Sequence, residues 1–163
     1  MKHTISILVE NHAGVLARVA GLFARRGFNI DSLAVGVTED EKISRITIIA
    51  DGTAYTLEQI KKQLNKLIDV IKVRHLPAEE LLSRELVLIK VACQPSQRAE
   101  LISLAEIAKA KISDITVNTM TLELSDSVPR IKTFEELLRP YGIKETVRTG
   151  SIAMQKGGAS MKL

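Results

Sequence analysis

The residues with the clearest binding chemistry are Asn11 and Gly14, in the loop Glu10-Asn11-His12-Ala13-Gly14. An apolar, β-branched run over residues 4–9 ends at this loop, and apolar residues then recur at helical spacing: Val15, Leu16, Val19, Leu22 and Phe23. A helix that begins here presents unpaired backbone N–H groups and the positive end of its dipole, which favour an anion such as a free carboxylate. The Asn11 amide can donate and accept, and Gly14 lets a ligand approach the backbone without a Cβ in its way. The same residues also suit an ordinary turn, so their types alone leave both interpretations open.

Around this loop, the first half of the chain predicts a βαββαβ order. Apolar alternation and β-branched residues predict strands, whereas apolar residues three and four apart predict helices. The strands cover residues 4–10, 28–37, 43–50 and 70–75, and the helices cover residues 14–26 and a stretch that starts near Thr56. Thr56 and Gln59 are spaced as a capping box, and Gly27 is placed to end the first helix. In this order both helices cover one face of a sheet, so the other face or an edge needs a partner.

The second half repeats the order after a short polar stretch that follows Pro77. Strands are predicted over residues 85–93, 113–118, 120–124 and 143–153, with helices over residues 97–108 and 128–138. The predicted fold class is therefore α+β, with two ferredoxin-like βαββαβ domains. Residues 1–77 form the first domain, residues 78–84 a linker and residues 85–163 the second domain, which ends in a loose tail from about residue 154. The lone cysteine, Cys93, excludes an intrachain disulfide and is expected in the core.

Several segments of the chain resemble a known family. Asn11-x-x-Gly14-Val15-Leu16, followed by Gly27-Phe28-Asn29-Ile30, resembles the ACT domain, a βαββαβ module that senses small molecules. Residues 29–36, Asn-Ile-Asp-Ser-Leu-Ala-Val-Gly, resemble one branch closely: the small, regulatory subunit of acetohydroxyacid (acetolactate) synthase. Residues 85–91 resemble the same family. No ligand site is recognisable in residues 85–163, which the resemblance assigns to dimer contacts and to engagement of the catalytic subunit.

The resemblance implies a non-catalytic subunit that binds and activates a large, thiamine-diphosphate-dependent catalytic subunit in branched-chain amino acid biosynthesis. It also implies feedback inhibition by valine, or by another branched-chain amino acid such as leucine or isoleucine. The effector is expected where the ACT domains of a homodimer pair through a shared sheet. No cofactor is expected in this chain. Thiamine diphosphate and Mg, with FAD as a further candidate, are expected in the catalytic partner.

The resemblance assigns six residues to the effector site: Asn11, Gly14, Val15 and Leu16 from one chain, and Asn29 and Ile30 from its partner. Asn11 and the N–H groups near Gly14 and Val15 would hold the effector carboxylate, and Asn29 with nearby carbonyls would hold the ammonium. Leu16 and Ile30 would enclose the isopropyl group. Helix and strand periodicity explains Leu16 and Ile30 equally well as core residues, so that alternative stays open.

The composition argues against several other functions. Charged residues make up 26% and hydrophobic residues 45% of the chain, as in ordinary soluble globular proteins. Aromatic residues make up only 3%, with no Trp, and the net charge of +4 comes from basic residues interspersed with acidic ones, which argues against nucleic-acid binding. No run approaches 18 apolar residues and the N-terminal residues lack the apolar stretch of a signal peptide, so we expect a cytoplasmic protein without a membrane segment.

Catalytic and metal-binding motifs are missing from the sequence as well. His3, His12 and His75 lie at no metal-ligand spacing, and His12 is most simply an exposed loop residue. The chain has no phosphate-binding glycine loop and no nucleophile with a histidine nearby, so we expect no catalytic residue and no metal site. Two alternatives stay open: a free-standing amino-acid sensor that controls gene expression, and an undetected enzyme acting on a small 2-oxo acid.

Overall fold

The computed structural model describes residues 1–162, and these residues form two compact units, each with its own hydrophobic core. The first unit holds Met1–Leu82 together with the residues from Ser151 onward. The second unit holds Ser83–Gly150. The second unit is therefore inserted into the first one along the chain, rather than following it.

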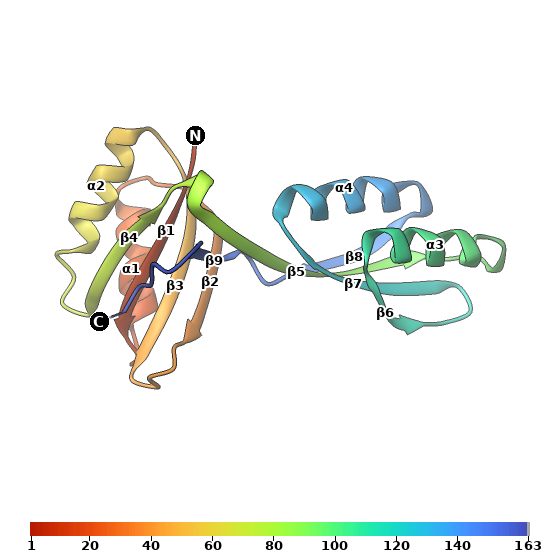
Figure 1. The fold of residues 1–163 in the computed structure, drawn as a ribbon, viewed down its shortest axis with the longest axis horizontal. Helices are drawn as coiled ribbons and strands as arrows, with labels where there is room; N and C mark the ends of the chain where they lie inside the picture. Colours follow the sequence, from red (N-terminus) through yellow and green to blue (C-terminus); the bar gives the residue numbers. More distant parts are fainter. Residues whose placement is uncertain (163) are drawn as a thin grey trace. The chain divides into compact units, whose positions relative to one another are not determined.

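The first unit has the predicted βαββαβ order (Figure 1). Its elements are β1 (Lys2–Glu10), α1 (Val15–Arg25), β2 (Ile30–Val37), β3 (Ile43–Asp51), α2 (Ala54–Leu64) and β4 (Val70–Leu76). The four strands form an antiparallel sheet in the order β2-β3-β1-β4, so β2 and β4 are its edges.

Strand alternation and helix periodicity build the core of the first unit. Ile5 and Ile7 of β1 and Ile46 of β3 are fully buried against α1 and α2. The helices contribute Val19 and Phe23, among others, from the apolar stripe that the sequence predicts. Because full burial of such a side chain is worth about 1.5–3 kcal/mol, this packing fixes which face of α1 lies against the sheet.

The ends of the two helices have different caps. Gly27 follows α1 with a φ of +68°, and the N–H of Phe28 donates to the Phe23 carbonyl at 3.0 Å, so the predicted stop at Gly27 is confirmed. The predicted cap of α2 is wrong by three residues. Thr53, not Thr56, is the N-cap, because the Thr53 side chain accepts the Thr56 N–H at 3.2 Å.

The sheet face opposite the helices is covered by the chain's own C-terminal residues 151–162, which we call the return segment. This segment contains β9 (Ile152–Gln155), which passes in front of β1 and β3 in Figure 1, whereas α1 lies behind them. Arg45 donates to the Ala153 carbonyl at 2.8 Å, and Arg74 donates to the Ser160 carbonyl at 3.2 Å. Ser6 and Leu8, which point away from the helices, are buried as a result. The predicted loose tail from about residue 154 is therefore wrong, because β9 continues to Gln155 and the carbonyls of Ser160 and Lys162 accept hydrogen bonds from Arg74 and Lys72 of β4. Residue 163 lies outside the described residues.

The second unit repeats the βαββαβ order and has its own core. Its elements are β5 (Leu81–Ala92), α3 (Arg98–Ala108), β6 (Lys111–Ile115), β7 (Thr119–Asp126), α4 (Val128–Leu138) and β8 (Ile143–Arg148), with short 3₁₀ turns at Pro95–Gln97 and Arg139–Tyr141; a further 3₁₀ turn at Ala78–Glu80 belongs to the first unit. The sheet order is β6-β7-β5-β8, and β9 also pairs with β5. Cys93 is fully buried in this core, as predicted.

The structure divides the chain differently from the predicted boundaries. Residues 81–84 of the predicted linker are the first residues of β5, because that strand begins at Leu81. The predicted final strand over residues 143–153 is two strands, β8 and β9, separated at Gly150, whose φ is +79°. A positive φ suits glycine and turns the chain away from β8, so the residues after Gly150 join the first unit instead of the second.

Candidate functional site

The loop between β1 and α1 has the geometry of an anion site at a helix N-terminus. Gly14 is the N-cap residue of α1 and has a φ of +88°, a left-handed conformation that favours glycine. The first intrahelical bond joins the Arg18 N–H to the Gly14 carbonyl at 3.1 Å, so the N–H groups of residues 15–17 have no partner within the helix. A Cβ built at Gly14 would meet no atom within 4 Å, which leaves open space beside these donors.

Asn11 lies in the same loop and is held by the turn between β2 and β3. Its backbone N–H donates to the Lys42 carbonyl at 2.7 Å, and its side-chain amide donates to the Glu41 carbonyl at 2.8 Å. An amide NH₂ carries two N–H donors, so Asn11 can keep this bond and still offer a donor to a ligand.

The structure separates the roles of Val15 and Leu16. Val15 is 3% exposed and belongs to the core of the first unit, so its side chain cannot line a site, although its N–H can. Leu16 is 42% exposed at the first turn of α1. Leu16 is therefore not a core residue of this unit, and its side chain is available to a ligand or a partner.

Asn29 and Ile30 lie elsewhere in the first unit. Asn29 is exposed, donates its side-chain amide to Asp31 at 2.8 Å and borders an open hollow of about 530 Å³ that Gly52 and Thr53 also line. Ile30 is half-buried and packs against the core of the first unit. The interpretation of Ile30 as a core residue is therefore correct for the buried part of its side chain.

Helix α1 separates these two groups of predicted site residues within one chain. Asn11 and Gly14 precede its first turn, whereas Asn29 and Ile30 follow its last turn. At 1.5 Å per residue its 11 residues span about 16 Å, far more than the length of a small amino acid. One copy of the chain therefore does not bring the six residues together.

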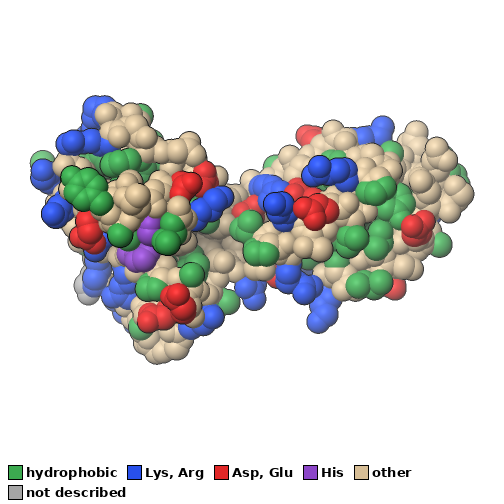
Figure 2. Space-filling model, turned by 90° about the horizontal axis from the view of Figure 1, so that it is seen from above, with side chains coloured by type: hydrophobic (Ala, Val, Ile, Leu, Met, Phe, Trp, Pro, Cys, Tyr) green, Lys and Arg blue, Asp and Glu red, His purple; other side chains and the backbone are tan. Residues whose placement is uncertain are grey.

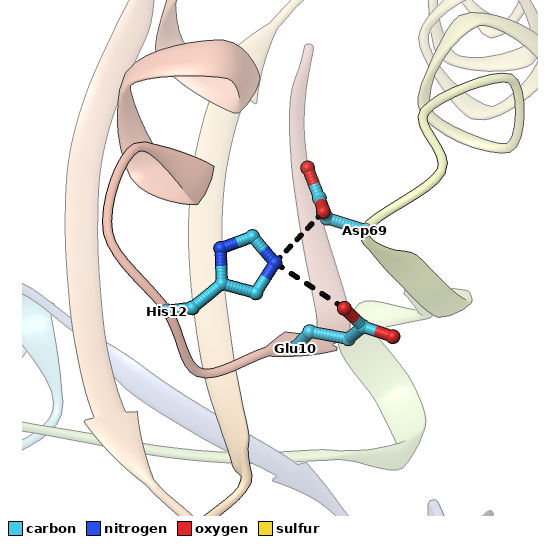
Figure 3. Close-up of side chains that lie close together, drawn as sticks. All are labelled: Glu10, His12 and Asp69. Carbon is cyan, nitrogen blue, oxygen red and sulfur yellow. Dashed lines mark ion pairs between the residues drawn. The ribbon is translucent and has the colours of Figure 1, made fainter.

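A cluster of charged side chains that the sequence did not indicate lies beside the Gly14 loop. Figure 3 shows one nitrogen of the His12 ring facing the carboxylates of both Glu10 and Asp69. His12 Nε2 lies 3.2 Å from Glu10 Oε2 and 2.9 Å from Asp69 Oδ1, and the Arg18 guanidinium also bonds Asp69. The ligand atoms of Glu10, His12 and Asp69 are close enough to admit a metal ion, but the Arg18 guanidinium already bonds the Asp69 carboxylate. We therefore assign the cluster as an ion-pair network.

This cluster predicts that His12 titrates above its ordinary pKa of 6.5. The Ala13 carbonyl beside Nδ1 raises the pKa of His12 most, and the carboxylates of Asp69 and Glu10 add to the effect. The pKa of His75 is instead lowered, first by burial and then by the neighbouring His3. In an NMR titration we expect the His12 ring to titrate at a higher pH than the His75 ring, and Glu10→Gln to lower the pKa of His12 only.

The sign of the pH dependence follows from this shift. Because the folded-state pKa of His12 is raised, its contribution to stability is full below pH 6.5 and is lost as the pH rises through the folded-state pKa. A His12 ring that titrates at or below the pKa of His75 would contradict the geometry of the cluster.

The charge pattern of one face and the length of the helices bear on two other types of site. Acidic and basic side chains are interspersed on the face seen in Figure 2, with no basic stripe of the kind that binds nucleic acid. None of the helices within residues 1–162 is long and apolar enough to cross a membrane.

Comparisons with known proteins agree with this fold over both units. A family model described as an AHAS small subunit-like ACT domain matches residues 5–72, and one described as the small subunit of acetolactate synthase matches residues 84–157. A probable acetolactate synthase small subunit from Archaeoglobus fulgidus is 50% identical over 96% of this chain and 98% of its own length. The acetolactate synthase small subunit of Mycobacterium leprae is 44% identical over 95% of this chain and 92% of its own length.

A solved structure extends the agreement to three dimensions. The acetolactate synthase small subunit of Thermotoga maritima superimposes with a TM-score of 0.91 at 38% identity, and the match covers 98% of this chain and 99% of that one. The chain thus contains two ferredoxin-like βαββαβ units, of which the first is an ACT domain. Their order along the chain is the same as in this solved structure. The chain belongs to the family of acetolactate synthase small subunits.

Proposed function

We propose that this chain is the non-catalytic regulatory subunit of acetolactate synthase. In this proposal it activates the thiamine-diphosphate-dependent catalytic subunit, which carries the cofactors, and confers feedback inhibition by valine or another branched-chain amino acid. The observation that carries the effector half of the proposal is the N-terminus of α1 at Gly14, where the N–H groups of residues 15–17 have no partner within the helix and a Cβ at Gly14 would meet no atom within 4 Å. An amino acid carboxylate fits donors of this kind.

Pairing of two copies through β2 explains why the predicted site residues lie apart in one chain. Strands β1 and β2 both run antiparallel to β3, so Val37 lies at the end of the sheet where β1 leads into the Gly14 loop. Ile30 lies at the opposite end of β2. If two β2 edges pair antiparallel across a two-fold axis, the Asn29–Ile30 end of one chain meets the Gly14 end of the other. The ammonium and side chain of the effector would then contact the partner.

The β2 edge carries apolar side chains that such a pairing would cover. Val35 is 47% exposed and Val37 is 63% exposed, both on the sheet face that the helices cover elsewhere. An open edge strand with apolar side chains favours association with another strand.

A charge on this edge should dissociate the dimer. We expect Val35→Lys to convert the protein from dimer to monomer at micromolar concentration, because the ammonium would be desolvated at the interface. Sedimentation velocity measures the change, and Ile152→Lys is a matched control, since Ile152 is 59% exposed but lies outside the β2 edge. A Val35→Lys protein that stays dimeric would place the dimer contact on another surface.

Reconstitution with the catalytic large subunit tests the function itself. We expect the chain to raise synthase activity several-fold and valine to reduce it, while the chain alone shows no synthase activity. Calorimetry with valine, leucine and isoleucine identifies the effector. An unchanged rate on adding the chain would overturn the activating role, and no heat with any of the three amino acids would overturn the effector site.

A further inference from the structure

Asn29 is connected to the return segment through two neighbouring residues of β2. Its side-chain amide donates to Asp31 at 2.8 Å. Asp31 is the residue that β2 skips in its register, because Ile30 pairs with Ala50 and Ser32 pairs with Ile49. Such a bulge re-aims the side chain that follows it, and bulges are common beside functional sites.

Ser32, the residue after the bulge, holds the first residue of the return segment. Its Oγ accepts the Ser151 N–H at 2.8 Å, and Ser151 is 1% exposed. Ser32 therefore lies on the sheet face that the return segment covers, one residue from the side chain that Asn29 contacts.

Only one residue separates this anchor from an anchor in the second unit. The Thr149 N–H donates to the Leu86 carbonyl at 3.1 Å, and Thr149 Oγ1 accepts the Leu86 N–H at 3.1 Å. Gly150 is the single residue between Thr149, bonded to β5, and Ser151, bonded to β2. A displacement of Ser151 that follows a change at Ser32 therefore reaches Thr149 along the chain through Gly150 alone.

We propose that Ser32 is the residue through which effector occupancy at Asn29 is transmitted to the second unit. This inference rests on the proposed effector site. An effector group that takes the Asn29 amide competes with Asp31 for the same donor, so the bonded and released states of Asp31 interact differently with the effector. Release of Asp31 resets the bulge, shifts Ser32 Oγ and loosens or tightens its bond to Ser151. In this scheme Asn29 binds the effector, and Ser32, three residues further along the chain, transmits its presence.

The variant Ser32→Ala separates effector binding from its transmission to the second unit, and Ser6→Ala is the matched control. Ser6 lies on the same sheet face and is fully buried, and its Oγ has no hydrogen-bond partner among the described residues. In the reconstituted holoenzyme with saturating valine, we expect Ser32→Ala to lower the ratio of uninhibited to inhibited activity by about fivefold or more, the size of an ordinary allosteric coupling. Activation without valine and the calorimetric Kd for valine should stay within about twofold of wild type. Ser6→Ala should be inhibited like wild type.

Amide exchange gives a second measurement that needs no catalytic subunit. Valine should change the exchange rate of the Ser151 N–H in the wild-type protein, whereas in Ser32→Ala this N–H should exchange faster and respond less to valine. Full inhibition of Ser32→Ala, or loss of valine binding together with inhibition, would overturn this inference alone. Valine that binds neither the wild type nor the variant would overturn the effector site on which it rests.

Discussion

Gly14→Asp should weaken effector binding about a hundredfold while activation of the catalytic subunit persists. The variant places a carboxylate where we expect the effector carboxylate. Two like charges about 4 Å apart repel by roughly 1 kcal/mol in water and by several-fold more where water is excluded. A loss of about 2.7 kcal/mol corresponds to two orders of magnitude in Kd, enough to abolish inhibition at ordinary valine concentrations. The measurements are the calorimetric Kd for valine and holoenzyme activity with and without valine.

Gly14→Asn is the control that separates charge from backbone strain. Both variants place an L-residue at a φ of +88°, which costs roughly 1–2 kcal/mol, and neither Cβ meets an atom within 4 Å. Asparagine has nearly the same shape as aspartate but no charge, so Gly14→Asn should keep inhibition with a much smaller loss of affinity. Equal inhibition of Gly14→Asp and wild type would place the effector elsewhere. Equal loss in both variants would mean that Gly14 serves the conformation of the loop rather than the charge of the site.

Removal of the return segment should destabilise the first unit by roughly 2–4 kcal/mol. A chain that stops after Gly150 loses the cover over Leu8, whose burial is worth about 1.5–3 kcal/mol, and the hydrogen bond from Arg45 to Ala153, worth about 0.5–1.5 kcal/mol. Because a domain of this size is stable by only about 5–15 kcal/mol, the loss should be large. Urea unfolding followed by amide exchange in β1 measures the free energy of the first unit separately from that of the second.

A shorter truncation and a peptide test whether β9 causes this effect. A chain that stops after Lys156 keeps β9 and the Arg45 bond, so its first unit should be close to wild type in stability. A peptide of residues 151–162 should restore stability to the longer truncation when added in excess. If the truncation after Gly150 is as stable as wild type, the return segment contributes no stability. The same cover is missing from a fragment that ends at Arg84, so that fragment should unfold more easily than the intact first unit.

The positions of most helices and strands follow from the sequence because they depend on local periodicity. Ile5 and Ile7 alternate toward one face of β1, and Val15, Val19 and Phe23 recur at helical spacing on α1. For the same reason, both βαββαβ orders and the buried state of Cys93 could be predicted.

Part of the candidate site could also be located from sequence, but not its arrangement. The resemblance named Asn11, Gly14 and Asn29, and the predicted helix over residues 14–26 already separated Asn29 from the other two, whereas only the structure shows that Asn11 is bonded to the turn between β2 and β3. The cluster of Glu10, His12 and Asp69 was missed, because Asp69 reaches the loop only through the pairing of β1 with β4. Contacts between residues far apart in sequence leave no periodic signal along the chain.

The sequence by itself determined the α+β class, the two repeated units, the position of the Gly14 loop and the core faces of the strands. Each of these depends on residues within one or two helical turns or strand pairs of each other. Only the tertiary structure decided that residues 151–162 return to the first unit. Ile152 and Met154 of β9 are exposed while Ala153 is buried, a pattern too short to identify a partner surface. The return segment is held in place by Arg45, which bonds the Ala153 carbonyl of β9, and by Arg74, which bonds the Ser160 carbonyl beyond it. A carbonyl is present at every position of any sequence, so these bonds leave no signal in it.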